Sequence, residues 1–124
     1  MNVALWIIAI VLAVAMGLAG LMKVSQSKEK LAAAGLRWVE DFSPNAVKTI
    51  GALEVLGAIG LFLPAVTNIA PILVPVAAVC VALVMVGAIV VHARRSEFTN
   101  IPVNVVLLIL AVVVAWGRFG SYAF

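Results

Sequence analysis

Charged residues are scarce in this sequence of 124 residues: Asp, Glu, Lys and Arg together make up 10%, against roughly a quarter in typical soluble domains. Hydrophobic residues make up 66%, and the mean hydropathy is +1.28. This shortage of charge excludes an ordinary water-soluble globular domain and favours an integral membrane protein. The net charge of +3 does not require a nucleic-acid partner, and we expect none.

Residues that carry redox or metal chemistry are equally rare. The chain has one cysteine, Cys80, and one histidine, His92, so it cannot form a disulfide, a CxxC pair or a zinc cluster within itself. No glycine-rich dinucleotide motif is present either, so we expect no metal, and no cofactor is evident apart from the quinone or lipid considered below. Cys80 is expected to be buried as a small apolar side chain. Whether the chain is an enzyme stays open, and these absences weigh against it.

Four long apolar stretches dominate what is present. They predict membrane-spanning helices over about residues 3–22, 44–64, 69–91 and 101–119, because about 20 helical residues cross a hydrocarbon core of about 30 Å. Ser43 followed by Pro44 has the pattern of an N-cap and a first helical residue, which places the start of the second span there. The fold class predicted for the single domain 1–124 is therefore all-α, a transmembrane four-helix bundle.

The longest connection, residues 23–47, carries an amphipathic pattern. Leu31, Gly35, Trp38 and Phe42 recur at helical spacing, while charged residues occupy the remaining positions. This pattern predicts a short interfacial amphipathic helix between the first and second spans, lying in the headgroup plane with Trp38 as an anchor. Such a helix is either a simple connector or a lid over a binding site.

The distribution of basic residues predicts the orientation. Seven of the eight Lys and Arg residues lie in or beside the connections 23–47 and 92–100, and the eighth is Arg118. Positively charged flanks stay on the cytoplasmic side during insertion. We therefore expect a multi-pass protein of the plasma membrane with both termini extracytoplasmic and these two connections in the cytoplasm.

Glu54 is the one acidic residue in the apolar stretch 49–64, and a charge at that depth is costly unless it faces the bundle interior and has a partner. In an antiparallel bundle, four other polar residues occupy the same leaflet: Lys23, His92, Arg94 and Asn104. We predict that these five residues form a polar cluster. It is either a clasp that fixes helix register or a proton-binding or ligand-binding site.

Small residues accompany Glu54 on its helix face. Gly51, Glu54 and Ala58 follow helical spacing, and Gly17 and Gly20 form a similar face in the first span. Small residues allow close helix approach in a bilayer. The spacing therefore turns Glu54 toward the bundle interior.

Four short strings in this order and spacing resemble the DoxX-like family of small four-helix membrane proteins. They are residues 20–23 (GLMK), 50–57 (IGALEVLG), 60–64 (GLFLP) and 87–92 (GAIVVH). The resemblance implies one four-helix membrane domain and singles out Lys23, Glu54 and His92 as its polar site. It also implies a connection with thiosulfate:quinone oxidoreduction, with redox-stress complexes at the membrane, or with receptor assembly.

Three functions are compatible with these features. The first is an accessory or ligand-binding subunit of a membrane complex, holding a quinone or a lipid headgroup at the polar cluster. The second is a non-enzymatic assembly factor or chaperone that recruits another membrane protein or a second copy of itself. The third is a small proton-coupled transporter, which is disfavoured because small multidrug transporters carry their essential acid in the first span and residues 3–22 contain none.

Overall fold

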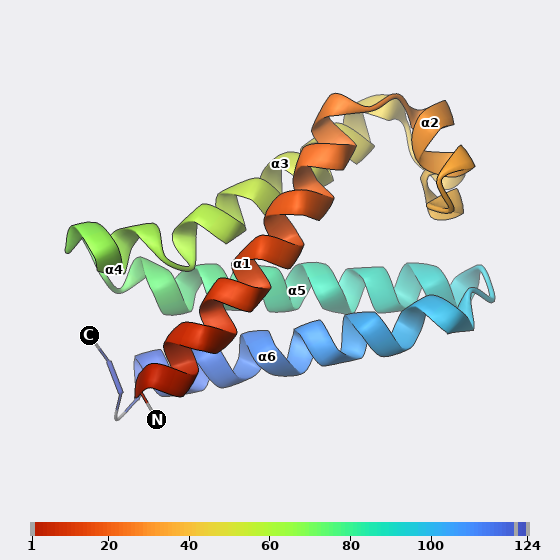
Figure 1. Ribbon diagram of the computed structural model, residues 1–124. Helices are drawn as coiled ribbons and strands as arrows, with labels where there is room; N and C mark the ends of the chain where they lie inside the picture. The colour runs from red at the N-terminus through yellow and green to blue at the C-terminus, as the bar shows by residue number, and fades with distance from the viewer. Residues whose placement is uncertain (1, 121, 124) are drawn as a thin grey trace.

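The computed structural model describes residues 2–120 and 122–123, and no strand occurs among them. Four long helices run alternately up and down: α1 (Asn2–Ser25), α3 (Pro44–Gly60), α5 (Leu73–Arg94) and α6 (Ile101–Phe119) (Figure 1). The short helix α4 (Leu63–Thr67) follows α3. Among the described residues, four segments are long and apolar enough to cross a membrane, namely Asn2–Ser25, Pro44–Thr67, Leu73–Arg94 and Phe98–Phe119. The all-α class with four spanning helices is confirmed.

The bundle consists of two helical hairpins. The most extensive contacts join α1 to α3 and α5 to α6. In Figure 1, α1 crosses over α5 and α6 and moves away from them toward α2 (Lys28–Ala33). We call the end that holds both termini and α4 the terminal end. We call the opposite end the cap end. It holds α2 and the two 3₁₀ helices η1 (Arg37–Asp41) and η2 (Phe98–Asn100).

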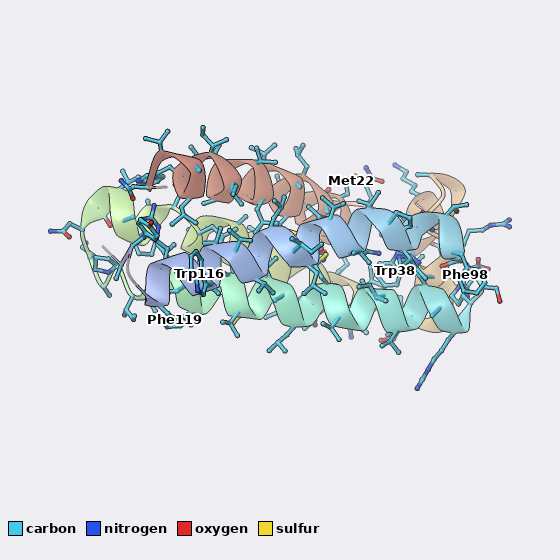
Figure 2. The ribbon with its side chains drawn as sticks, turned by 90° about the horizontal axis from the view of Figure 1, so that it is seen from below. Met22, Trp38, Phe98, Trp116 and Phe119 are labelled. Carbon is cyan, nitrogen blue, oxygen red and sulfur yellow. The ribbon has the colours of Figure 1, made fainter. Side chains whose placement is uncertain are left out.

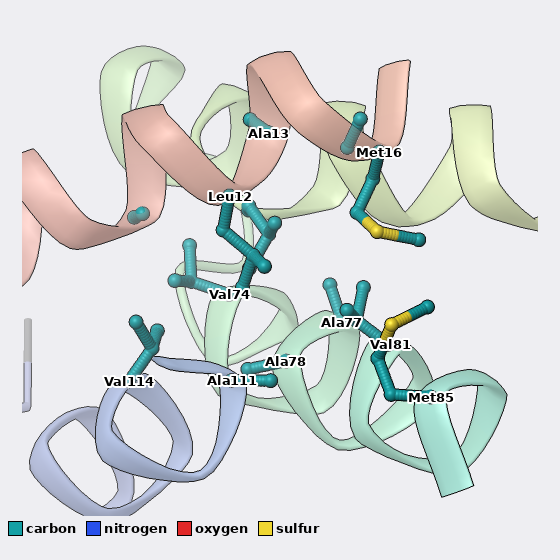
Figure 3. Close-up of a cluster of buried hydrophobic side chains, with 13 residues drawn as sticks. Leu12, Ala13, Met16, Val74, Ala77, Ala78, Val81, Met85, Ala111 and Val114 are labelled. Atoms are coloured by element: carbon teal, nitrogen blue, oxygen red, sulfur yellow. The ribbon is translucent and has the colours of Figure 1, made fainter. Parts of the chain in front are cut away.

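The apolar core occupies the terminal half of the bundle. Leu12 and Met16 of α1 face Val74 and Met85 of α5 in this core (Figure 3), and α6 adds Val114. Met16 and Met85 are the core residues of their helices nearest the cap end. Between the hairpins, the core therefore stops about halfway along the bundle.

The outer surface of the bundle carries large apolar side chains, as a lipid-facing surface requires. Ile7, Leu18, Leu83 and Ile109 are all more than half exposed. Cys80 of α5 is also exposed, so the expectation of a buried thiol was wrong. A small apolar side chain is as compatible with lipid as with a core, and composition does not distinguish the two positions.

The interfacial connection is not the single helix expected from its pattern. Its helical pattern is interrupted after α2 by Gly35, whose φ of +104° lies in the left-handed region that glycine tolerates at little cost. The chain then forms η1. As a result, Leu31 and Val39 pack with Val47 of α3 in a small separate core.

Two helix starts show how local sequence sets the spans. The backbone N–H of Ala46 donates a 3.1 Å hydrogen bond to Ser43 Oγ, and Pro44 occupies the first turn, as the N-cap pattern predicted. The third span begins at Leu73 rather than near residue 69. Ala70, which precedes Pro71, has a φ of +47° and is therefore outside the right-handed helical region, which is disfavoured for a residue before proline.

Candidate functional site

A cavity of about 590 Å³ lies between the two hairpins at the cap end, where the apolar core has stopped. Ligand pockets in proteins typically measure about 300–1,000 Å³. All four long helices and η1 contribute to its lining. Met16, Val84, Met85 and Leu107 are among its apolar lining residues, and its polar lining residues are Lys23, Glu54, His92, Asn100 and Asn104.

Lys23 and Glu54 form a buried ion pair at this cavity. Lys23 Nζ donates a hydrogen bond of 2.6 Å to Glu54 Oε1, and the two residues are only 8% and 3% exposed. Such a charge-assisted bond is stronger than a neutral one. The expected partnership between the ends of the first two spans is therefore present in the structure.

The ring of Trp38 in η1 lies next to the Lys23 ammonium. The ring centroid of Trp38 lies 5.6 Å from Lys23 Nζ, within the range of a cation–π contact. Phe42 meets Trp38 edge to face, with ring centroids 5.5 Å apart, and both rings line the cavity. Figure 2 shows Trp38 at the cap end, far from Trp116 and Phe119. Trp38 was expected only as a headgroup anchor, and its place beside Lys23 was missed.

His92 is held by a carboxylate that sequence reasoning missed. Its Nδ1 lies 2.9 Å from Glu97 Oε1, and the His92 residue is 7% exposed and lines the cavity. The turn after α5 explains the approach. Ser96 has a φ of +58°, the Ser96 N–H donates to the Ala93 carbonyl, and the Glu97 N–H donates to the His92 carbonyl. This is a Schellman motif, and it folds Glu97 back over His92.

Arg95 connects this loop to the cap segment, residues 28–42. Its Nε donates to Glu97 Oε2 at 3.1 Å, its Nη1 lies 2.8 Å from Asp41 Oδ2, and its Nη2 lies 3.6 Å from Glu40 Oε1. Hydrogen bonds to Asp41 and Glu97 raise the pKa of Arg95. Partial burial favours a higher pKa for Glu97, but hydrogen bonds from His92 and Arg95 outweigh it and lower that pKa.

Four of the five predicted cluster residues line the cavity: Lys23, Glu54, His92 and Asn104. Asn104 donates its side-chain N–H to the Asn100 carbonyl at 3.2 Å. Arg94 is exposed at the end of α5 and is not among the lining residues. Its neighbour Arg95 forms the ion pairs instead.

The terminal end has a separate polar contact. Arg118, in the last turn of α6, is 3% exposed. It donates hydrogen bonds to Asn2 Oδ1 at 2.5 Å and to the Tyr122 carbonyl at 2.9 Å, and its guanidinium carbon lies 5.8 Å from the Trp6 ring centroid. Arg118 therefore joins the two chain ends and takes no part in lining the cavity.

Chemically, the polar end of the cavity offers an ammonium, a carboxylate, an imidazole and two amides, with apolar walls behind them. Among the residues that the structure describes, no three His, Cys, Asp or Glu side chains come together to hold a metal ion. The arrangement suits the polar head of an amphipathic molecule.

The sequence profile of the DoxX-like family matches residues 7–114, which is most of the chain. The chain belongs to this family. Searches of curated proteins and of solved structures found no match. Family membership and the four apolar helices together identify a small multi-pass membrane protein whose environment is a lipid bilayer.

Proposed function

We propose that this protein is an accessory membrane subunit that binds a lipid-soluble ligand, a quinone or a lipid, in the cavity between its two hairpins. One observation carries the proposal. The cavity of about 590 Å³ has apolar walls and a polar end formed by Lys23, Glu54, His92 and Asn104. An amphipathic ligand matches this division, because its head can form hydrogen bonds at one end while its tail lies along the apolar wall.

The polar end can bind such a head directly. A lysine ammonium has three donor hydrogens, so Lys23 can donate to a ligand oxygen while it stays paired with Glu54. Asn104 supplies an amide, and His92 supplies a second ring nitrogen besides the one that faces Glu97. Glu54 and His92 are the groups able to exchange a proton with the ligand.

Electrons for a bound quinone would come from a partner protein. One cysteine and one histidine provide no redox centre of their own. The distribution of Lys and Arg supports an orientation with the cap end in the cytoplasmic leaflet of the membrane and both termini outside. The ligand head would then lie near the cytoplasmic surface, within reach of a membrane protein partner or a second copy of the chain.

Gly87 provides a direct test, because it lines the cavity and a Cβ added there would meet no atom within 4 Å. The Gly87→Leu variant should fill the cavity without displacing a neighbour. Ala52→Leu is the matched control, since Ala52 is exposed on α3 and does not line the cavity. Native mass spectrometry of protein extracted from its own membrane should show a bound quinone or lipid that Gly87→Leu loses and Ala52→Leu keeps.

Glu54→Gln adds a chemical test to the steric one. This variant keeps the shape of the side chain and removes its charge. It should lose the ligand-dependent function because the polar head of the ligand is bound less well, while the contacts of its apolar tail stay the same. If the extracted parent protein carries neither quinone nor lipid, or if Gly87→Leu retains the same ligand, the proposal fails. A stoichiometric protein partner in place of a small ligand would favour an assembly factor.

A further inference from the structure

One non-spanning segment covers the cavity at the cap end. Leu36, Trp38 and Phe42, in and beside η1, line the cavity together with the long helices. Their side chains lie at its polar end, where the Trp38 ring is next to the Lys23 ammonium. Residues 36–42 therefore cover part of the polar end on the side of the cap.

The two sides of this segment are fastened differently. Toward α3, Val39 is fully buried with Leu31 and Val47 in the cap's own apolar core. Toward the other hairpin, Arg95 holds the segment through Asp41 and Glu40. The side chain of Arg95 is 23% exposed, and those of Glu40 and Asp41 are 55% exposed. Ion pairs at such exposed positions are individually weak and screened by salt, so this side is the one that can open.

The same arginine is also linked to the cavity through the carboxylate of Glu97. Arg95 Nε donates to Glu97 Oε2 at 3.1 Å, and Glu97 Oε1 lies 2.9 Å from His92 Nδ1. A carboxylate on one ring nitrogen fixes the orientation and tautomer of a histidine. Glu97 therefore holds His92 and Arg95 at once.

We propose that residues 36–42 form a lid over the cavity, that Arg95 latches this lid to the loop after α5, and that Glu97 is the positioning residue that couples the latch to His92. This inference rests on the proposed function in one respect only, namely that the cavity under the lid binds a ligand. Closure of the lid fixes the position of the Arg95 side chain. Arg95 and His92 both bind the Glu97 carboxylate, so the orientation of His92 in the cavity depends on whether the lid is closed.

The first experiment measures lid opening without any ligand. Hydrogen exchange followed by mass spectrometry is recorded on the full chain in detergent. Arg95→Gln and Asp41→Asn should each raise the exchange rate of residues 36–42 by about 1.5- to 5-fold, as expected for the loss of exposed ion pairs. Arg94→Gln is the matched control, because Arg94 is the exposed neighbour of Arg95. Unchanged exchange in Arg95→Gln, or an equal rise in Arg94→Gln, would overturn the latch.

The second experiment measures coupling at His92. The chain has a single histidine, so after removal of any affinity tag the imidazole signals in a nuclear magnetic resonance spectrum report one site. Asp41→Asn changes only the lid, yet it should shift the His92 ring signals, as should Glu97→Gln. Arg94→Gln should leave them in place. A faster-exchanging lid with unmoved His92 signals would overturn the coupling. Failure of ligand binding would leave both readouts intact, because neither experiment contains a ligand.

Discussion

Gly20 and Gly51 face each other where α1 crosses α3, with no room for a side chain on either. A Cβ added to Gly20 would lie 2.6 Å from the carbonyl oxygen of Gly51, and one added to Gly51 would lie 2.7 Å from the Cβ of Lys23. Backbones this close bring Lys23 within 2.6 Å of Glu54. The small-residue faces therefore set the geometry of the buried ion pair.

Gly20→Ala should destabilise the protein. The new methyl group would meet the Gly51 carbonyl oxygen and the Val55 backbone nitrogen at 2.6 and 2.9 Å, so the helices must separate. We expect the free energy of unfolding to fall by about 1–3 kcal/mol, measured by thermal unfolding in detergent. Gly87→Ala is the control. It should be neutral or slightly stabilising, because alanine is favoured over glycine in a helix by about 0.5–1 kcal/mol. Equal melting of the two variants would contradict this account.

Glu54→Leu should destabilise the protein more strongly than Glu54→Gln. It leaves the ammonium of Lys23, a residue that is 8% exposed, without its carboxylate, and removal of one partner of a buried pair costs about 3–5 kcal/mol. The double variant Lys23→Met, Glu54→Leu should recover most of this loss, since no unpaired charge remains. Thermal unfolding of the three variants in one detergent measures the series. A Glu54→Leu protein that melts like the parent would show that the pair is not important for stability.

The sequence predicts the spans well because composition and local pattern determine them. Ser43 accepts a hydrogen bond from a free backbone N–H at the start of the helix, and Pro44 has no N–H that needs a partner. Both effects depend only on neighbouring residues. The cap segment is different. Leu31, Trp38 and Phe42 keep a helical spacing, but the left-handed conformation of Gly35 interrupts the helix. Leu31 is fully buried in the small cap core, whereas Trp38 packs against that core and also lines the cavity. Periodicity does not reveal which residues of an apolar face will also line a cavity.

The sequence predicts which end of the bundle the polar residues occupy, because the topology determines it, but it does not predict their individual contacts. Antiparallel connection alone brings Lys23, Glu54, His92 and Asn104 to one end of the bundle. It does not determine which of them pair. The partner of His92 is Glu97, and that contact depends on the turn at Ser96. A Schellman motif ending in serine rather than glycine gives little sequence signal.

Arg118→Gln should weaken the terminal end of the bundle. Arg118 is 3% exposed, and its guanidinium donates to Asn2 Oδ1 and to the Tyr122 carbonyl. Hydrogen bonds that involve a charged group contribute about 1.5–3 kcal/mol, so we expect a loss of unfolding free energy of that size. Arg37→Gln is the control, because Arg37 is exposed on the cap segment. The same melting temperature for Arg118→Gln and Arg37→Gln would argue against a structural role.

Glu97 should make the cap end sensitive to acid. Its pKa is lowered in the folded protein from an ordinary value of 4.5, so the unfolded chain takes up this proton first as the pH falls. The stabilisation from Glu97 is therefore fully present above pH 4.5 and is lost as the pH falls through the lowered pKa. The melting temperature of the parent should drop over this range, and Glu97→Gln should show a shallower drop.

The informative quantity is the difference between the two curves of melting temperature against pH, one for the parent and one for Glu97→Gln. Glu29→Gln removes an exposed carboxylate from α2 and should reproduce the steep drop of the parent. At neutral pH, Glu97→Gln should melt below the parent, because the hydrogen bonds with His92 and Arg95 lose their charge assistance. The two curves should then converge as acid protonates Glu97 in the parent. Parallel curves for the parent and Glu97→Gln would mean that Glu97 is not held by His92 and Arg95 as the structure indicates.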